Sequence, residues 1–196
     1  MHLRVLITLL GTLALLGVLA GCGGKRASTA ATTASATTAV SHAAPDLEAR
    51  LPAAFDGHRL EKGSATGAVV LSGGDAFSRE LKRILARKGK QPAALHFANA
   101  QDPTGTLELE VGAFEVQGMN APALRDAIVK SSRPNAPGLA VSRLDLAGKP
   151  VTKVVYPGGA TLYLYPRGPV VYYVGTQREA LAERIIARLP YTTRPG

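Results

Sequence analysis

The stretch that decides the fold is LAVSRLDLAGKPVTKVVYPGGATLYLYPRGPVVYYVGT, residues 139–176. It is rich in Val, Tyr, Thr and Leu, the residues that favour strands. Turn signals interrupt it at Ala147-Gly148, Gly158-Gly159 and Arg167-Gly168. The sequence therefore predicts an antiparallel meander of four strands, near residues 139–146, 150–156, 160–166 and 169–175.

Hydrophobic periodicity predicts a helix over residues 75–88, before the meander. Its apolar residues recur at helical spacing, and Gly89 supplies the stop signal. The stripe expected to face the core is Phe77, Leu81, Ile84 and Leu85.

Two further helices flank the meander on either side. The first covers about 121–131, with Asn120 as N-cap and Pro122 in the first turn. The second covers 177–189, where Thr176 and Glu179 have the spacing of a capping box.

A strand is expected over residues 106–117 because aliphatic and acidic residues alternate there. The alternation places Glu108 and Glu110 on one solvated face, with Glu115 nearby. Surface carboxylates of this kind serve solubility, or they form the acid pair of a hydrolase if a cleft holds substrate between them.

The fold class that follows is α+β. Helix follows strands in both halves of the domain, so we expect a two-layer sandwich with a mainly antiparallel sheet and about three helices on one face, built from two ββα-like halves. The folded domain is expected over residues 45–190, with a C-terminal tail at 191–196. The only Cys excludes an intrachain disulfide and a Cys-based zinc site.

The N-terminus has the layout of an export signal. One positive charge, Arg4, precedes an apolar run of 16 residues from Val5 to Ala20, which is shorter than the roughly 20 residues of a spanning helix. The run ends in Leu19-Ala20-Gly21-Cys22.

These four residues resemble the lipobox of bacterial lipoproteins. The resemblance implies cleavage after Gly21, so that 1–21 is a signal peptide, and acylation of Cys22. Two or three acyl chains anchor a protein stably to a bilayer. The lipoprotein would be extracytoplasmic, on the outer side of the cytoplasmic membrane, and the Ala/Ser/Thr-rich residues up to 44 would form a disordered tether.

Two surfaces of the domain are candidate binding sites. The chain has a formal charge of +9, and the helix at 75–88 carries cations that would face solvent. These cations form a candidate binding face for an envelope polyanion or an anionic lipid; the alternative is a plain solvated surface. The residues of this face are Arg79, Lys82, Arg83 and Arg87. Nucleic acid is not expected for an exported chain without a nucleic-acid motif.

The second surface is aromatic. With two-residue loops, Tyr163 pairs with Tyr172, and the tyrosines share an open face of the meander. Such a face suits a sugar or a protein partner, and it also serves as a cross-strand ladder that stabilises the sheet. Its members are Tyr156, Tyr163, Tyr165 and Tyr172.

Two functions are compatible with these features. The first is a non-catalytic binding or structural module of the cell envelope, with no cofactor, metal or catalytic residue. The second is an envelope hydrolase that acts on a glycan or ester through the carboxylates above. A deep cleft with converging polar groups would favour the enzyme.

Overall fold

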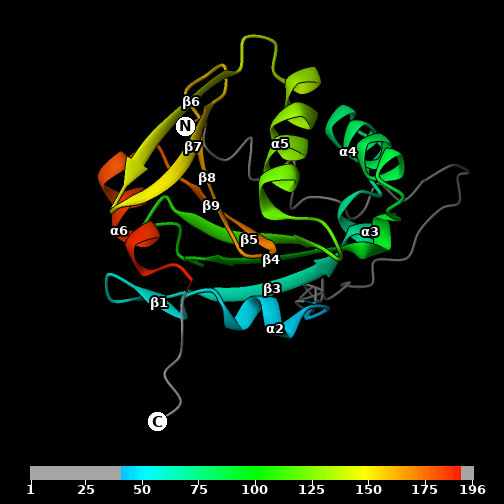
Figure 1. The fold of residues 1–196 in the computed structure, drawn as a ribbon. Helices are drawn as coiled ribbons and strands as arrows, with labels where there is room; N and C mark the ends of the chain where they lie inside the picture. Colours follow the sequence, from blue (N-terminus) through cyan, green and yellow to red (C-terminus); the bar gives the residue numbers. More distant parts are fainter. Residues whose placement is uncertain (1–40, 191–196) are drawn as a thin grey trace, which may run out of the picture.

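The computed structural model describes residues 41–190 of the chain. Its centre is a seven-stranded antiparallel sheet in the order β3-β4-β5-β9-β8-β7-β6 (Figure 1). The strands are β3 (Glu61–Thr66), β4 (Leu95–Gln101), β5 (Glu110–Val116), β6 (Ala140–Leu146), β7 (Lys149–Val155), β8 (Thr161–Arg167) and β9 (Val170–Gly175). A short hairpin of β1 (Ala54–Phe55) and β2 (His58–Arg59) lies beside it.

Helices connect and cover these strands. They are α2 (Pro45–Ala49), α3 (Gly67–Val70), α4 (Ala76–Arg87), α5 (Ala121–Ser132) and α6 (Glu179–Arg188), with short 3-10 turns η1 (Pro92–Ala94) and η2 (Arg133–Asn135). The α+β class is confirmed. None of the helices in residues 41–190 has the length and hydrophobicity needed to cross a membrane.

The predicted meander is confirmed as β6 to β9, within one residue at each end. The predicted helices at 75–88 and 121–131 are confirmed as α4 and α5. Their caps form as expected: the Asp75 side chain accepts from the Ser78 amide and the Asn120 side chain from the Ala123 amide.

The end of α4 follows from Gly89. This glycine has φ +67°, a conformation that costs other residues steric strain. The Gly89 amide donates to the Ala86 carbonyl and the Lys90 amide to the Leu85 carbonyl, each at 2.9 Å. This pair of bonds is a Schellman motif and closes the helix.

The predicted capping box of α6 is wrong. The helix begins at Glu179 with Arg178 as N-cap, and no side chain caps it. The Thr176 hydroxyl accepts instead from the Arg178 amide at 3.2 Å, two residues along the chain.

The loop between β7 and β8 differs from the expected two-residue turn. Tyr156 pairs with Ala160, so residues 157–159 form a three-residue loop. Tyr163 therefore lies opposite Lys153. Because a shift of one residue reverses the face of every side chain, Tyr156 projects from the face opposite to Tyr163.

The loop between β8 and β9 is displaced by one residue from its expected place. Arg167 pairs with Val170, which leaves Gly168-Pro169 as the turn. Tyr165 lies opposite Tyr172, and the expected pairing of Tyr163 with Tyr172 is wrong.

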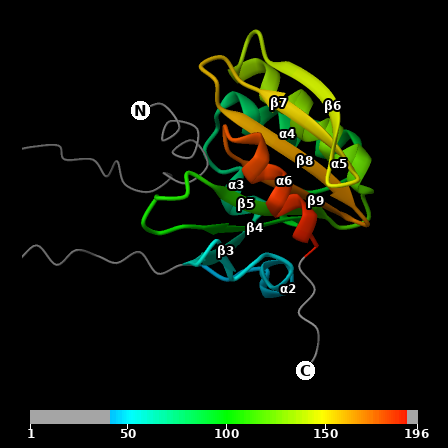
Figure 2. The same ribbon diagram turned by 90° about the vertical axis from the view of Figure 1, so that its left-hand side faces the viewer.

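The helices cover both faces of the sheet, which corrects the expected placement on one face. One core cluster joins α4 and α5 to one face of the sheet, and a second joins α2 and α6 to the other (Figures 1 and 2). The central strand β9 explains why: all of its residues from Val170 to Val174 are buried. A strand that is apolar on both sides needs cover on both sides.

The folded part includes residues 41–44, which were expected to belong to the tether. The Ser64 amide donates to the Ser41 carbonyl at 2.8 Å, and the Ala44 amide donates to the Ser64 hydroxyl at 2.7 Å. His42 Nδ1 lies 2.9 Å from a carboxylate oxygen of Glu48. This segment covers the outer edge of β3. The predicted signal peptide, Cys22, the rest of the predicted tether and the predicted tail at 191–196 lie outside the described residues.

Candidate functional site

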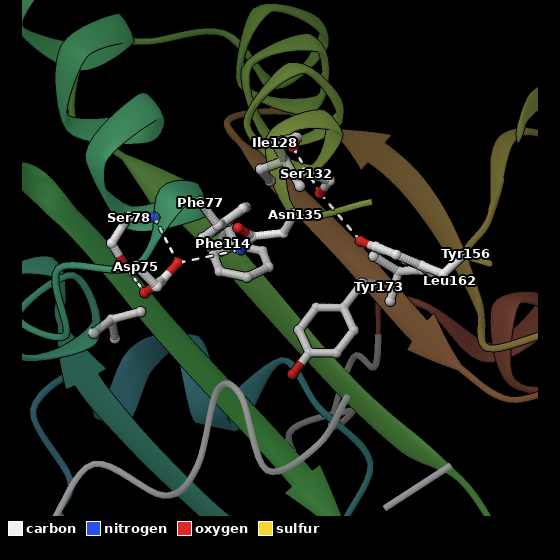
Figure 3. Close-up of a pocket in the computed structure, with 11 residues that line it drawn as sticks. Asp75, Phe77, Ser78, Phe114, Ile128, Ser132, Asn135, Tyr156, Leu162 and Tyr173 are labelled. Carbon is white, nitrogen blue, oxygen red and sulfur yellow. Dashed lines mark hydrogen bonds between the residues drawn. The ribbon is translucent and has the colours of Figure 1, made fainter. Parts of the chain in front are cut away.

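A pocket of about 120 Å³ lies between α4, α5 and the sheet (Figure 3). Aliphatic and aromatic side chains form most of its wall. For comparison, an engineered apolar cavity of about 150 Å³ accepts benzene. The pocket thus has room for one ring or a short branched alkyl group. Its apolar residues are Val70, Phe77, Phe114, Ile128, Leu162 and the ring of Tyr173.

One end of the pocket carries an ionised carboxylate. Asp75 caps α4: its Oδ1 accepts from the Ser78 amide at 3.0 Å, and its Oδ2 accepts from the Ser78 hydroxyl at 2.6 Å. Asn135 of η2 approaches it to 3.5 Å. Burial acts to raise the pKa of Asp75, but these hydrogen bonds outweigh it and hold the pKa below its usual value.

The other end of the pocket holds a chain of hydroxyl groups. Tyr156 Oη donates to Ser132 Oγ at 3.1 Å, and Ser132 Oγ donates to the Ile128 carbonyl at 3.0 Å (Figure 3). Ser132 is buried, and burial raises the pKa of Tyr156. Both hydroxyl groups are therefore neutral, and each donates its hydrogen to an acceptor within the protein.

The Tyr173 ring belongs to an aromatic cluster beneath the pocket. Its centroid is 5.4 Å from that of Phe114 and 6.1 Å from that of Phe97. Gly112, on the neighbouring strand, makes room for the ring: a Cβ there would lie 2.3 Å from a Tyr173 ring carbon.

The Tyr173 hydroxyl points away from the pocket towards a buried acid. Tyr173 Oη donates to Glu110 Oε1 at 2.6 Å. Burial raises the pKa of Glu110, although Tyr173 and Asn99 oppose the shift by donating hydrogen bonds. Burial likewise raises the pKa of Tyr173 well above its usual value. Alternation alone placed Glu110 in solvent, and no local signal marked it as buried.

The carboxylates considered for hydrolysis do not form a surface pair. Glu108 precedes β5, is exposed and has φ +48°, so the strand alternation does not extend to it. Glu110 is buried in the sheet, and Glu115 projects from the other face of β5. The expectation that Glu108 and Glu110 share a solvated face is wrong, because the chain turns before β5 begins.

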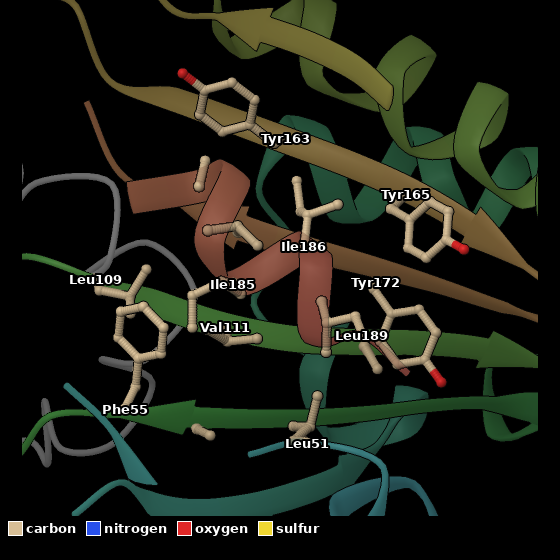
Figure 4. Packing of buried hydrophobic residues seen from close by; sticks show 14 of the residues in the cluster. Leu51, Phe55, Leu109, Val111, Tyr163, Tyr165, Tyr172, Ile185, Ile186 and Leu189 are labelled. Atoms are coloured by element: carbon tan, nitrogen blue, oxygen red, sulfur yellow. The ribbon is translucent and has the colours of Figure 1, made fainter. Parts of the chain in front are cut away.

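The expected open tyrosine face is also wrong. Tyr163, Tyr165 and Tyr172 are 1%, 5% and 2% exposed. They lie under α6, among side chains that include Ile185, Ile186 and Leu189 (Figure 4). Tyr156 is on the other face, where it lines the pocket. The predicted ladder survives as one stacked pair, Tyr165 and Tyr172, with ring centroids 6.2 Å apart.

The cationic face of α4 is located as the helix periodicity predicts. Leu81 and Leu85 are fully buried, Arg79, Arg83 and Arg87 are exposed, and Lys82 is half-buried. Part of this charge is internally neutralised. Glu80 accepts two hydrogen bonds from Arg83, at 2.7 and 2.8 Å, and lies 3.9 Å from Arg87. Arg79 donates to the Gly74 carbonyl.

The pocket could not be predicted from sequence patterns, because its walls come from distant parts of the chain. Asp75 and Asn135, for example, are 60 residues apart. Within residues 41–190, no three His, Cys, Asp or Glu side chains cluster in a way that would hold a metal ion. Comparisons of the chain with protein-family models, curated proteins and solved structures find no match.

Proposed function

We propose that this chain is a membrane-anchored lipoprotein of the cell envelope, and that its domain is a non-catalytic module that binds a small molecule between α4, α5 and the sheet. The observation that carries the binding role is the pocket itself: a half-open apolar cavity with polar groups at two ends. Ligand sites in proteins have this composition.

The lipobox-like residues support the anchor. Leu19-Ala20-Gly21-Cys22 follows a short apolar run, and the chain has no other cysteine. Acyl chains on Cys22 would hold the domain on the outer side of the cytoplasmic membrane. Replacing Cys22 with Ser should shift the protein from the membrane fraction to the soluble fraction or leave its precursor unprocessed. A Cys22→Ser protein that is cleaved normally and stays in membranes would contradict the anchor.

The non-catalytic role agrees with the groups that line the pocket. Asp75 is engaged as a helix cap and the Ser132 hydroxyl donates to a backbone carbonyl, so neither is arranged as a nucleophile with an adjacent base. The buried position of Glu110 removes the acid pair on which the hydrolase alternative depended. We therefore favour binding over hydrolysis.

Benzyl alcohol is a suitable first probe of the pocket because it is neutral and carries one ring. We expect it to shift amide resonances of the residues around the pocket in a two-dimensional NMR titration. Leu162→Phe should abolish these shifts by filling the cavity. Leu144→Phe is the matched control, since Leu144 is also a half-buried strand residue but packs in the other core cluster. Shifts that persist in Leu162→Phe would contradict the assignment.

A further inference from the structure

We infer that the pocket selects an apolar ring that carries a protonated amine, and that it discriminates against carboxylates. This inference rests on the proposed small-molecule site and specifies its ligand class. It follows from the charge, the hydrogen-bonding capacity and the size of the pocket.

The charge within the pocket is negative. Asp75 is the single carboxylate among the lining residues, and these residues, all within the described part of the chain, include no Lys, Arg or His. A bound carboxylate would therefore lie close to a like charge without a compensating cation, which is unfavourable in a partly desolvated site. A bound ammonium would meet an opposite charge.

The hydrogen-bonding capacity also favours a donor. The hydroxyl hydrogens of Tyr156 and Ser132 are both donated within the protein, so at that end the Tyr156 oxygen can only accept a hydrogen bond from a ligand. At the other end, the Asp75 carboxylate is an acceptor only, and its two oxygens offer more lone pairs than Ser78 and Asn135 occupy. A ligand group that donates several hydrogen bonds, as an ammonium does, satisfies this arrangement.

Two positive features act against a cation and limit the selectivity. Asp75 lies at the N-terminus of α4, where the helix dipole is positive. Arg79, one turn further, donates to the Gly74 carbonyl beside Asp75. Arg79 is exposed, so solvent screens it more than it screens the half-buried Asp75, and the negative charge dominates in the pocket. Because Arg79 still opposes a bound cation, replacing it with Gln should strengthen amine binding.

Size restricts the apolar part to one ring. The pocket of about 120 Å³ is smaller than the roughly 300 Å³ at which drug-sized sites begin. The long apolar chain of a fatty acid does not fit this volume.

The test uses the mature chain from residue 22 to the end, with Cys22→Ser so that no acyl group is added. Benzylamine, benzyl alcohol and benzoate share one ring and differ in the polar group, and each is titrated at pH 7 by NMR. We expect benzylamine to bind about fivefold more tightly than benzyl alcohol, because a charge-assisted hydrogen bond is roughly twice as strong as a neutral one. Benzoate should bind most weakly.

The critical variant is Asp75→Asn. Asn keeps the capping acceptor of α4 but removes the charge, so benzylamine should lose its advantage over benzyl alcohol. Asp126→Asn is the matched control: this carboxylate is exposed on α5 and does not line the pocket, and its replacement should leave all three affinities unchanged. If Asp75→Asn fails to fold, Arg79→Gln tests the same field, with benzylamine expected to bind more tightly.

The outcomes separate this inference from the proposed function. If benzyl alcohol binds but benzylamine has no advantage, or if the advantage survives in Asp75→Asn, the ligand class is wrong and the pocket remains a small-molecule site. Equal or tighter binding of benzoate would also overturn the ligand class. If none of the three compounds perturbs the pocket, the proposed function fails, and the inference fails with it.

Discussion

Tyr173 Oη and Glu110 Oε1 are 2.6 Å apart in a buried hydrogen bond that joins the central strand β9 to its neighbour β5. Burial favours the neutral form of both groups, because it raises the pKa of the Glu110 carboxyl and of the Tyr173 phenol. A buried acid with no cationic partner among its described contacts makes the stability of the fold depend on pH.

The first prediction is the sign of that dependence. The folded protein retains the Glu110 proton above the usual Glu pKa of about 4.3, whereas the unfolded chain releases it. This contribution to stability is fully present below about pH 4.3 and is lost as pH rises through the raised folded-state pKa. Glu110→Gln keeps an acceptor for Tyr173 without a titrating group, so its free energy of unfolding relative to wild type should increase from pH 4 to pH 8.

Urea unfolding at pH 4, 6 and 8 measures this difference directly. Glu108→Gln is the control, since that carboxylate is exposed and should change stability little at any of the three pH values. A Glu110→Gln difference that does not vary with pH would contradict the raised pKa of Glu110.

The second prediction concerns the close approach of Gly112 to Tyr173. Gly112→Ala would place a Cβ 2.3 Å from the Tyr173 ring and 2.6 Å from the Ala98 carbonyl oxygen. We expect a loss of about 1–3 kcal/mol in the free energy of unfolding, the usual cost of overpacking a core. Gly175→Ala on β9 is the matched control, because its Cβ would meet its nearest neighbour at an ordinary 3.8 Å. Equal stability of the two variants would contradict the steric role of Gly112.

The third prediction concerns Lys149, which holds the end of α6. Its ammonium donates to the carbonyls of Ile186, Ala187 and Leu189 at 2.7, 3.0 and 2.5 Å. Replacing Lys149 with Met keeps most of the apolar stem but removes the ammonium donor from all three carbonyls, of which, among the described residues, only that of Ile186 keeps a further donor, the Leu189 amide. A loss of about 1–3 kcal/mol is expected for hydrogen bonds to a charged group.

Lys153→Met is the control for Lys149→Met. Lys153 makes an ion pair with Glu179 at 2.7 Å in which the Glu179 carboxylate is half exposed, and such pairs contribute about 0–1 kcal/mol. Thermal denaturation of both variants compares the contributions of the two lysines to stability. A larger loss for Lys153→Met than for Lys149→Met would contradict the role of Lys149 in holding the end of α6.

The fourth prediction tests the cationic face of α4 as an anion-binding surface. Each cation near an anionic membrane contributes about 1 kcal/mol, and salt weakens the attraction. Replacing Arg79, Lys82, Arg83 and Arg87 with Gln should reduce binding of the chain from residue 22 onwards, with Cys22→Ser, to vesicles with anionic lipid at low salt. The same substitutions should have little effect at high salt.

A control of equal charge separates this surface from the net charge of the protein. Four other exposed arginines can be changed to Gln together: Arg59, Arg133, Arg143 and Arg167. If both sets of substitutions reduce vesicle binding equally, the α4 face has no special role.

The sequence predicted the elements that depend on local interactions. The four strands of the meander and the apolar stripe of α4 appear in the structure, because each is set by residues a few positions apart. The capping box of α6 failed because Arg178, which no local rule favours, became the N-cap. The open tyrosine face failed because α6 covers Tyr163, Tyr165 and Tyr172. The extra residue in the loop at 157–159 also placed Tyr156 on the opposite face of the sheet.

The sequence by itself determined the α+β class and the strand and helix positions of its C-terminal half, since periodicity and turn residues act over short distances. Only the tertiary structure decided which face each helix covers, because β9 is apolar on both sides and its pattern favours neither. The tertiary structure also decided where the pocket forms, because Asp75 and Asn135 lie side by side there although they are 60 residues apart in the sequence. It likewise decided the burial of Glu110 beside Tyr173. Contacts of this kind depend on how distant segments pack, and short-range sequence patterns do not specify them.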